Sequence, residues 1–275
     1  MYDFRGSFRA LALAAPIAAV ALVGLGSGAR AQGLFGDGQS VDLSVGGVVV
    51  VKPAFEGSKK YNVIGIPFIL PGGPETDQSR FKVKGADDFR FRLLNLQNLE
   101  LGALGGWRFG RQEDDSDRLI GLGDVDGGLV VGGYAAYHLG PVSPFVSYHH
   151  QVTGTETGGV LRFGAETGIQ IAPSIKLTGM AGASWADDSY MTSFFGVSAA
   201  QSTASGLTAF DAHAGIKDAF VQVGTEFQFD QAWKLKLSAR YTRLVGDAAS
   251  SPITETADQF TGMATLSYDF RLPLP

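Results

Sequence analysis

The sequence predicts an all-β protein: a closed antiparallel transmembrane β-barrel of about twelve strands, preceded by a cleaved signal peptide. Apolar and polar residues alternate with a period of two along almost the whole chain after residue 31. Many of these alternating runs are about ten residues long, and a tilted strand needs roughly 9–11 residues to cross a bilayer. The segments between the runs are rich in Gly, Pro, Asp and Ser, which are turn-forming residues.

The N-terminus has the pattern of an export signal. Arg5 and Arg9 precede an apolar run at 10–25, and Ala29-Arg30-Ala31 is an A-x-A cleavage site. Cleavage there makes Ala31 the last residue removed and Gln32 the first mature residue. A membrane anchor is the alternative, but the run is shorter than the roughly 20 residues of a spanning helix. The chain therefore divides into a signal peptide at 1–31 and an outer-membrane barrel at 32–275.

The predicted strands follow one another as hairpins, with no linker and almost no helical periodicity. The alternation is strongest at 41–52, 159–171, 174–185, 220–229, 232–243 and 260–270. Further strands are expected at 61–70, 79–85, 88–94, 99–109, 128–139, 143–151 and 209–217. An even number of strands places both chain ends in the periplasm, so that 53–60 and 245–258 become outer loops.

The segment 232–243, AWKLKLSARYTR, illustrates the two faces of a strand. Trp233, Leu235 and Leu237 alternate with Lys234 and Lys236. In a barrel the apolar face contacts hydrocarbon and the polar face lines the lumen. Trp233 and Tyr241 are eight residues apart, or about 25 Å of strand, which is the height of the apolar band between the two aromatic girdles. The aromatic residues expected to face lipid are Trp233, Tyr241, Tyr268 and Phe270.

A soluble β-sandwich would also alternate, but three features argue against it. The apolar faces contain many Gly and Ala residues, charges recur in mid-strand, and the exported chain has no cysteine to form the disulfides usual in small secreted domains. In lipid, small outward residues suffice, and closure of the sheet removes edges that hydrocarbon could not hydrogen-bond.

Ten charged residues are expected to face the lumen. Either opposite charges pair across a narrow lumen and fill it, which is the favoured interpretation, or the excess of bases lines a pore for anionic solutes. These residues are Arg90, Arg92, Arg108, Arg162, Glu166, Lys176, Glu226, Lys234, Lys236 and Arg240.

Neither catalysis nor a cofactor is indicated by the sequence. A barrel hydrolase needs Ser, His and a carboxylate in one cluster, and the four histidines (His138, His149, His150 and His213) lie in no G-x-S-x-G or H-E-x-x-H motif. The acidic segments at 114–117 and 187–188 lack a Gly-punctuated calcium loop. Without residues 1–31 the chain has 19 basic and 26 acidic residues, a net charge of −7, which argues against nucleic acid as a partner.

Several segments, in order along the mature chain, resemble the MipA/OmpV family (MltA-interacting protein). They are PAFEGSKKY at 53–61, GLGD at 121–124, SWADDSYMTSFFGV at 184–197, ASGLTAFDAHAGIKD at 204–218, SARYTRLVGDAASSPI at 238–253 and LSYDF at 266–270. The resemblance implies a β-barrel in the Gram-negative outer membrane, in contact with lipid. For the name-giving member it implies a scaffold that bridges a lytic transglycosylase and a penicillin-binding protein. It implies no catalytic residues.

The expected function is therefore a non-enzymatic scaffold that links the outer membrane to murein-processing enzymes. The alternative is a small-solute channel, or a porin-like protein of envelope stress or antibiotic susceptibility, and a lipid-modifying barrel enzyme ranks last. One departure from the family pattern is the RLPLP segment after Phe270, whose prolines are expected to end the last strand.

Overall fold

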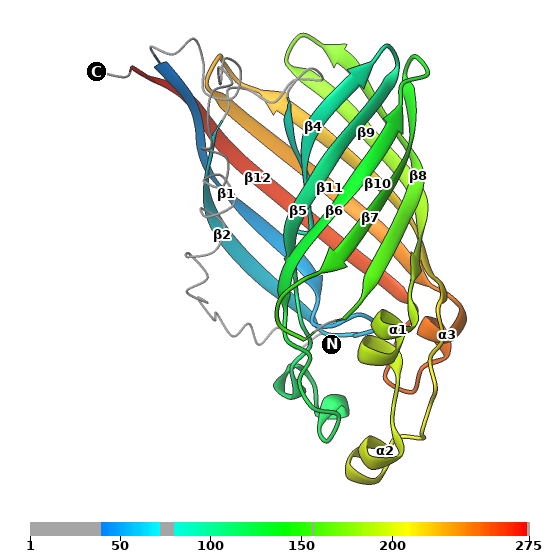
Figure 1. Cartoon of the computed structure of the whole chain (residues 1–275). Coiled ribbons are helices and arrows are strands. Elements are labelled where there is room, and N and C mark those ends of the chain that lie inside the picture. The colour runs from blue at the N-terminus through cyan, green and yellow to red at the C-terminus, as the bar shows by residue number, and fades with distance from the viewer. Residues whose placement is uncertain (1–39, 72–79, 156, 274–275) are drawn as a thin grey trace, which may run out of the picture.

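The computed structural model describes residues 40–71, 80–155 and 157–273, so the predicted cleavage between Ala31 and Gln32 lies outside the described residues. The described chain forms a single antiparallel sheet of twelve strands in the order β2-β1-β12-β11-β10-β9-β8-β7-β6-β5-β4-β3. From β3 to β12 each strand pairs with the next one in sequence (Figure 1). β1 pairs with β2 on one side and with β12 on the other. One curled sheet of this kind is a barrel architecture and excludes a two-sheet sandwich.

The strands coincide closely with the alternating runs of the sequence. Their bounds are β1 Ser40–Pro53, β2 Tyr61–Pro71, β3 Phe81–Gly85, β4 Asp88–Leu96, β5 Leu99–Arg108, β6 Gly128–Tyr137, β7 Val142–Gln151, β8 Gly159–Ala172, β9 Ile175–Ala186, β10 Gly215–Gln228, β11 Trp233–Leu244 and β12 Asp258–Pro273. The strand expected at 209–217 is wrong, because Phe210 makes only an isolated bridge to Val197 and β10 begins at Gly215.

The last strand also corrects an expectation about the C-terminus. β12 continues past Phe270 to Pro273, and Pro273 lies opposite Ser40 of β1. Proline lacks the amide hydrogen that a ladder needs, but at the last position of a strand that loss is small.

The two ends of the barrel differ in the length of their connections (Figure 1). At one end, called here the turn end, adjacent strands are joined by two to four residues, at 97–98, 138–141, 173–174 and 229–232, and the described chain begins and ends there. At the other end, the loop end, lie the long connections 54–60, 109–127, 187–214 and 245–257. Residues 53–60 and 245–258, expected together as outer loops, do lie at this same end.

Short helices occur only in the loop-end connections of the described chain. They are α1 Asp188–Phe195, α2 Ala199–Ser205 and α3 Gly246–Ser250, with 3₁₀ turns η2 Glu113–Asp115 and η3 Asp117–Leu119. None of the described helices is long and apolar enough to span a membrane. Sequence periodicity missed them because eight residues or fewer give barely two helical turns.

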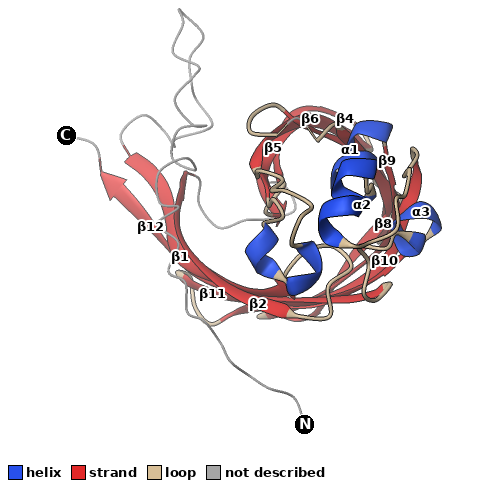
Figure 2. Cartoon of the chain, turned by 90° about the horizontal axis from the view of Figure 1, so that it is seen from below, coloured by secondary structure: helices blue, strands red, loops and turns tan. Residues whose placement is uncertain are grey.

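The sheet curls into a near-barrel whose seam lies between β2 and β3 (Figure 2). The predicted class of antiparallel barrel is confirmed, but in the described residues β2 and β3 are the two edges of the sheet and do not pair. β3 has five residues whereas β2 has eleven, so β3 offers a partner for less than half of the β2 edge.

Candidate functional site: the barrel interior and the loop layer

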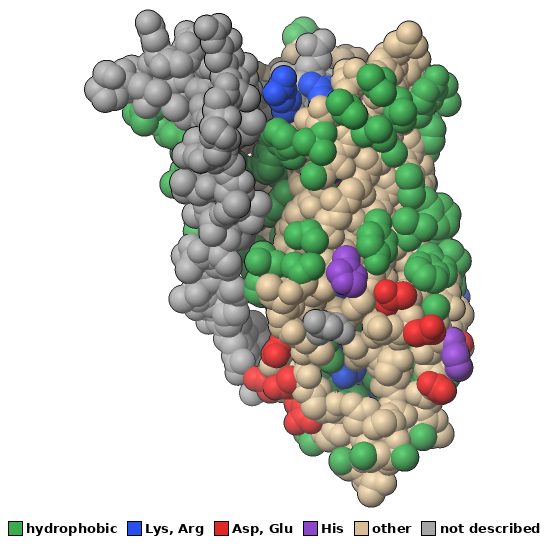
Figure 3. Space-filling model, viewed as in Figure 1, with side chains coloured by type: hydrophobic (Ala, Val, Ile, Leu, Met, Phe, Trp, Pro, Cys, Tyr) green, Lys and Arg blue, Asp and Glu red, His purple; other side chains and the backbone are tan. Residues whose placement is uncertain are grey.

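The strand register separates an apolar from a polar face. Trp233 of β11 lies opposite Tyr268 of β12, with ring centroids 5.1 Å apart, and Tyr268 lies opposite Val45 of β1. Residues directly opposite each other in a sheet share a face. Because these side chains are exposed or partly exposed, they belong to the outer face, where hydrophobic side chains cover the strand region seen in Figure 3.

Aromatic residues mark both ends of the outer face. Trp233, Tyr268 and Phe270 gather near the turn end. Near the loop end the ring of Tyr241 lies 5.2 Å from that of Phe260, and its hydroxyl donates to Asp258 at 2.6 Å. Two aromatic levels separated by an apolar band are the arrangement found at the two interfaces of an outer-membrane barrel.

A cluster of four charges crosses the interior. Arg90 donates from Nε and Nη2 to the two carboxylate oxygens of Asp88, at 2.8 and 2.9 Å. Arg162 of β8 reaches Asp87 at 3.2 Å and Asp88 at 3.8 Å. Since β8 is not adjacent to β4 in the sheet, these contacts span the lumen. Asp88 and Arg90 are each 2% exposed, and buried charges are tolerated only when they are paired in this way.

A second cluster gathers around Glu100, nearer the turn end. The carboxylate of Glu100 accepts hydrogen bonds from Lys82 at 3.2 Å and from the Tyr134 hydroxyl at 2.8 Å. Arg92 lies 3.8 Å and His138 3.5 Å from the same carboxylate. One buried acid thus contacts the cations of β3 and β4, a tyrosine hydroxyl of β6 and a histidine in the turn that follows β6.

The remaining inward acids also face cations. Glu166 of β8 lies 3.2 Å from Lys84 of β3, again across the lumen. Glu226 lies opposite both Lys176 and Lys236 in the sheet, and its carboxylate is 3.7 Å from the Lys236 amine.

The other predicted inward bases lie against strand neighbours and aromatic rings. Arg240 donates to the Gln222 side chain at 2.9 Å and stacks over the Phe220 ring at 4.5 Å. Arg108 donates to Thr157 at 3.0 Å and to the carbonyls of Gly158 and His149, both at 3.1 Å. Lys234, opposite Gln228, is 6% exposed.

A Ser–His pair with a nearby carboxylate is present in the interior. His149 Nε2 lies 2.9 Å from Ser147 Oγ, and its Nδ1 lies 3.0 Å from the Asp87 carbonyl and 3.8 Å from the Asp87 carboxylate. Ser147 and His149 are 1% and 0% exposed. In this arrangement the Ser147 hydroxyl is closed off from bulk solvent. The described residues also contain no group of His, Cys, Asp and Glu placed to hold a metal ion.

The loop-end connections pack into a layer with its own apolar core. Tyr190, Met191, Phe194 and Phe195 of α1 pack with strand and loop residues in one cluster, and a second cluster joins Phe55, Leu119, Leu122, Val197 and Ile253 from four different connections. Helices and loops of this layer lie across the barrel end in Figure 2. We call this structure the loop layer.

Polar contacts tie the loop layer to the barrel. Lys217 of β10 donates to Glu56 at 2.8 Å and to Asp218 at 2.7 Å, and Tyr190 donates to Glu56 at 2.9 Å. Burial, together with the negative charge of Glu56, raises the pKa of the Tyr190 hydroxyl. Tyr190 therefore stays protonated and keeps donating this hydrogen bond well into the alkaline range.

Residues 45–270 match the family described as MltA-interacting protein MipA. The chain belongs to the MipA family. The matched range runs from β1 to β12 and so includes both the strands and the loop layer. No curated protein matches the chain.

The MipA-family chain also superposes loosely on solved outer-membrane barrels. The N-terminal β-barrel domain of Pseudomonas aeruginosa OprF is 12% identical, with 63% of this chain and 98% of that chain covered and a TM-score of 0.29. OmpT of Vibrio cholerae is 10% identical, with 84% of this chain and 97% of that chain covered and a TM-score of 0.36. The NanC porin is 6% identical, with 83% of this chain and 98% of that chain covered and a TM-score of 0.40. Identities and TM-scores this low support no inference about function.

Several residues of the MipA-family interior escaped the sequence analysis. Asp88 lies two residues before Arg90 in β4, and Glu100 lies eight residues before Arg108 in β5. The two-residue period of a strand therefore predicts that both acids face inward with these bases. Asp87 lies in the turn between β3 and β4, and no local pattern shows that this turn meets β8. Lys217 and Asp218 lie beside a break in register between β9 and β10, where alternation fails.

Proposed function

We propose that this MipA-family protein is a non-enzymatic outer-membrane scaffold that holds a murein-processing enzyme near the membrane, rather than a channel. The family supports a partner of this kind through its name, MltA-interacting protein. The observation that carries the proposal is that ion pairs cross the loop-end half of the lumen while a packed loop layer covers that end.

The size of the barrel makes this filling informative. An eight-stranded barrel is just wide enough for side chains to fill, so twelve strands leave room for solvent unless long side chains reach inward. Here Arg90, Arg108 and Arg162 occupy that room and are paired or hydrogen-bonded. A conducting pore needs a continuous water-filled path, and these contacts obstruct such a path through the lumen.

The partner is expected at the turn end. With both ends of the described chain and the short turns on the periplasmic side, the surfaces available to a murein enzyme are the four short described turns and the rim of the lumen around them. Bases and acids both reach this rim, including Lys236, Glu226 and His138.

Site-specific crosslinking in intact cells tests the scaffold. The chain has no cysteine, so one introduced thiol is unique. Asn98→Cys places it at the turn end, and Thr203→Cys is the matched exposed control in α2 at the loop end. We expect the Asn98→Cys protein to crosslink to a lytic transglycosylase or a penicillin-binding protein and the Thr203→Cys protein not to do so. Equal labelling of both, or crosslinks to neither enzyme, contradicts the scaffold.

Planar-bilayer recording tests the channel separately. We expect the purified protein to insert without a steady conductance. A stable open level that depends on the charge of the permeant ion would make the protein an anion-selective channel and overturn the proposal.

A further inference from the structure

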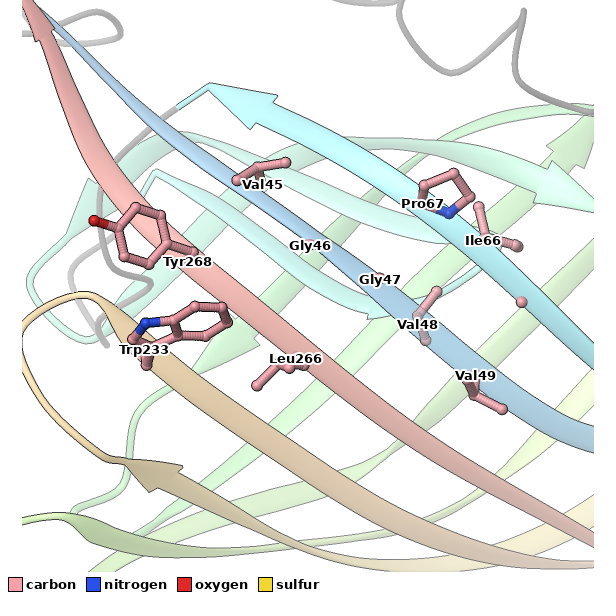
Figure 4. A pocket seen from close by; sticks show the side chains of 11 residues that line it. Val45, Gly46, Gly47, Val48, Val49, Ile66, Pro67, Trp233, Leu266 and Tyr268 are labelled. Atoms are coloured by element: carbon pink, nitrogen blue, oxygen red, sulfur yellow. The ribbon is translucent and has the colours of Figure 1, made fainter.

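An open apolar groove of about 500 Å³ lies on the outer face of β1, β2, β11 and β12 (Figure 4). Its volume falls within the range of small-molecule sites. The eleven residues that line it are all Gly, Val, Ile, Leu, Pro, Trp or Tyr, and none carries a charge. An occupant must therefore be apolar, at least along the length of the groove.

Two glycines keep the groove open although the backbone does not require them. A Cβ added at Gly65 would meet no atom within 4 Å, and one at Gly47 would lie 3.9 Å from the Ile66 carbonyl oxygen. Neither residue has a positive φ. A Cβ fits at both positions without a clash, so packing of the sheet does not by itself require glycine at either one.

The groove runs from the aromatic residues near the turn end toward the middle of the strands. It begins at Trp233 and Tyr268, whose rings pack side by side next to the turn end, and it extends along β1 from Val45 to Val49. Four residues of strand extend about 13 Å along the strand axis, which at a tilt of roughly 40° is about 10 Å of the apolar band of about 25 Å on such barrels. The far end of the groove shares its sheet register with Leu237, since Val49 is opposite Ala264 and Ala264 is opposite Leu237.

We propose that this groove is a binding site for one acyl chain of a phospholipid from the leaflet at the turn end. The groove is continuous with the apolar face that an outer-membrane barrel turns toward lipid, and aromatic residues such as Trp233 and Tyr268 sit at the level of lipid headgroups. An acyl chain running inward from that level matches the length, the uncharged lining and the open side of the groove. The proposal rests on the outer-membrane fold and not on the scaffold role.

Quenching of Trp233 by brominated lipid tests the site. In a Trp107→Phe, Trp185→Phe background Trp233 is the sole tryptophan. Detergent-solubilised, delipidated protein is titrated with phosphatidylethanolamine that carries a brominated acyl chain. We expect quenching to saturate as for a single site, and Gly65→Leu, which fills the groove, to abolish this saturable component.

Gly262→Leu is the matched control. Gly262 is also outward on β12, a Cβ there meets no atom within 4 Å, and the residue does not line the groove. We expect this variant to keep the saturable quenching. If Gly65→Leu does not fold, as judged by its far-ultraviolet circular dichroism, Gly47→Leu fills the same groove from β1 and takes its place.

Two outcomes overturn the proposal. Quenching that never saturates, or that Gly65→Leu leaves unchanged, means that lipid covers this face without a site. One edge of β2 has no partner strand among the described residues. Because β2 contributes to the groove, a second copy of the chain is the competing occupant. A loss of dimer in Gly65→Leu by sedimentation, with quenching unchanged, would assign the groove to that copy.

Discussion

At the scale of single residues, the interior depends on charges that are buried and paired. Asp88 and Arg90 form a two-point ion pair with almost no exposure, whereas Arg243 and Asp258 form an equally short pair that is about half exposed. Solvent screens the second pair and not the first. The two pairs should therefore differ in what the loss of one partner costs.

Asp88→Asn is expected to lower the free energy of unfolding by about 3–5 kcal/mol, because it leaves the Arg90 charge buried without its carboxylate. Arg243→Gln is the control and should cost no more than about 1 kcal/mol. Urea unfolding of protein refolded into vesicles gives both values. The double variant Asp88→Asn/Arg90→Met should recover part of the loss. Equal effects of the two single variants would mean that the interior pair is solvated.

The two faces of β11 give a second prediction at this scale. Leu237 faces outward at mid-strand, and Lys236 faces inward beside Glu226. Leu237→Arg should cost roughly 2–4 kcal/mol near the membrane midplane, and Lys236→Gln should be nearly neutral for folding. The same refolding assay ranks them. The reverse order would mean that the faces are assigned wrongly.

At the scale of elements, the loop layer depends on caps and buried hydroxyls rather than on long helices. Asp187 caps α1 by accepting the Tyr190 amide at 2.9 Å, and it also accepts the Gly159 amide at 2.6 Å. One carboxylate thus joins α1 to the first residue of β8. A helix of eight residues gains little from propagation, so such contacts and the packing of α1 hold it in place.

Asp187→Ala is expected to loosen α1 while leaving the barrel folded. Loss of an N-cap costs about 0.5–2 kcal/mol, and the Gly159 amide loses its acceptor as well. Limited proteolysis should then cleave within 187–214 faster than in the wild type. Ser198→Ala, the cap of α2, is the comparison and should affect only 199–206. Unchanged cleavage in Asp187→Ala would remove the carboxylate from this role.

Tyr190 makes the stability of the loop layer depend on pH in the alkaline range. Its pKa is raised by burial and by Glu56, so the folded layer holds the phenolic proton more tightly than the unfolded chain. The contribution to stability is complete below the ordinary tyrosine pKa of about 10 and is lost as pH rises above it. Proteolysis of the loop layer should accelerate above that pH, and Tyr190→Phe should remove this part of the dependence.

At the scale of the whole molecule, the sheet is least secured at its seam. β3 pairs only with β4, and β2 only with β1, within the described residues. β10 and β11 pair along nearly their full length on both sides. Local opening is easiest where a strand has one partner and few residues.

Hydrogen exchange in detergent micelles should follow this order. Amides of β3 are expected to exchange before those of β10 and β11, with β2 between them because it is longer and fully paired to β1. Mass spectrometry of peptides from each strand reads the order. Protection of β3 equal to that of β11 would show that the seam is closed by strong pairing in solution.

Pattern alone located the strands because each obeys the same two-residue period. It missed α1 and α2, although Ser198 and Gln201 form a capping box visible in the sequence, because capping signals are weak beside a strongly alternating chain. It found Arg162 as an inward charge without its partner Asp87, because a turn has no period and its side chains are placed by contacts between distant strands.

The sequence by itself indicated the class of fold, since side-chain alternation is local and is visible without knowledge of the partner strands. It indicated the family through its motifs, among them those at 184–197 and 238–253. Only the tertiary structure decided which charges meet across the lumen, how the long connections build one loop layer, and where the outer face is hollow at Gly47 and Gly65. The physical reason is that ion pairs, packing and grooves arise between residues far apart in the chain, where neither periodicity nor spacing carries information.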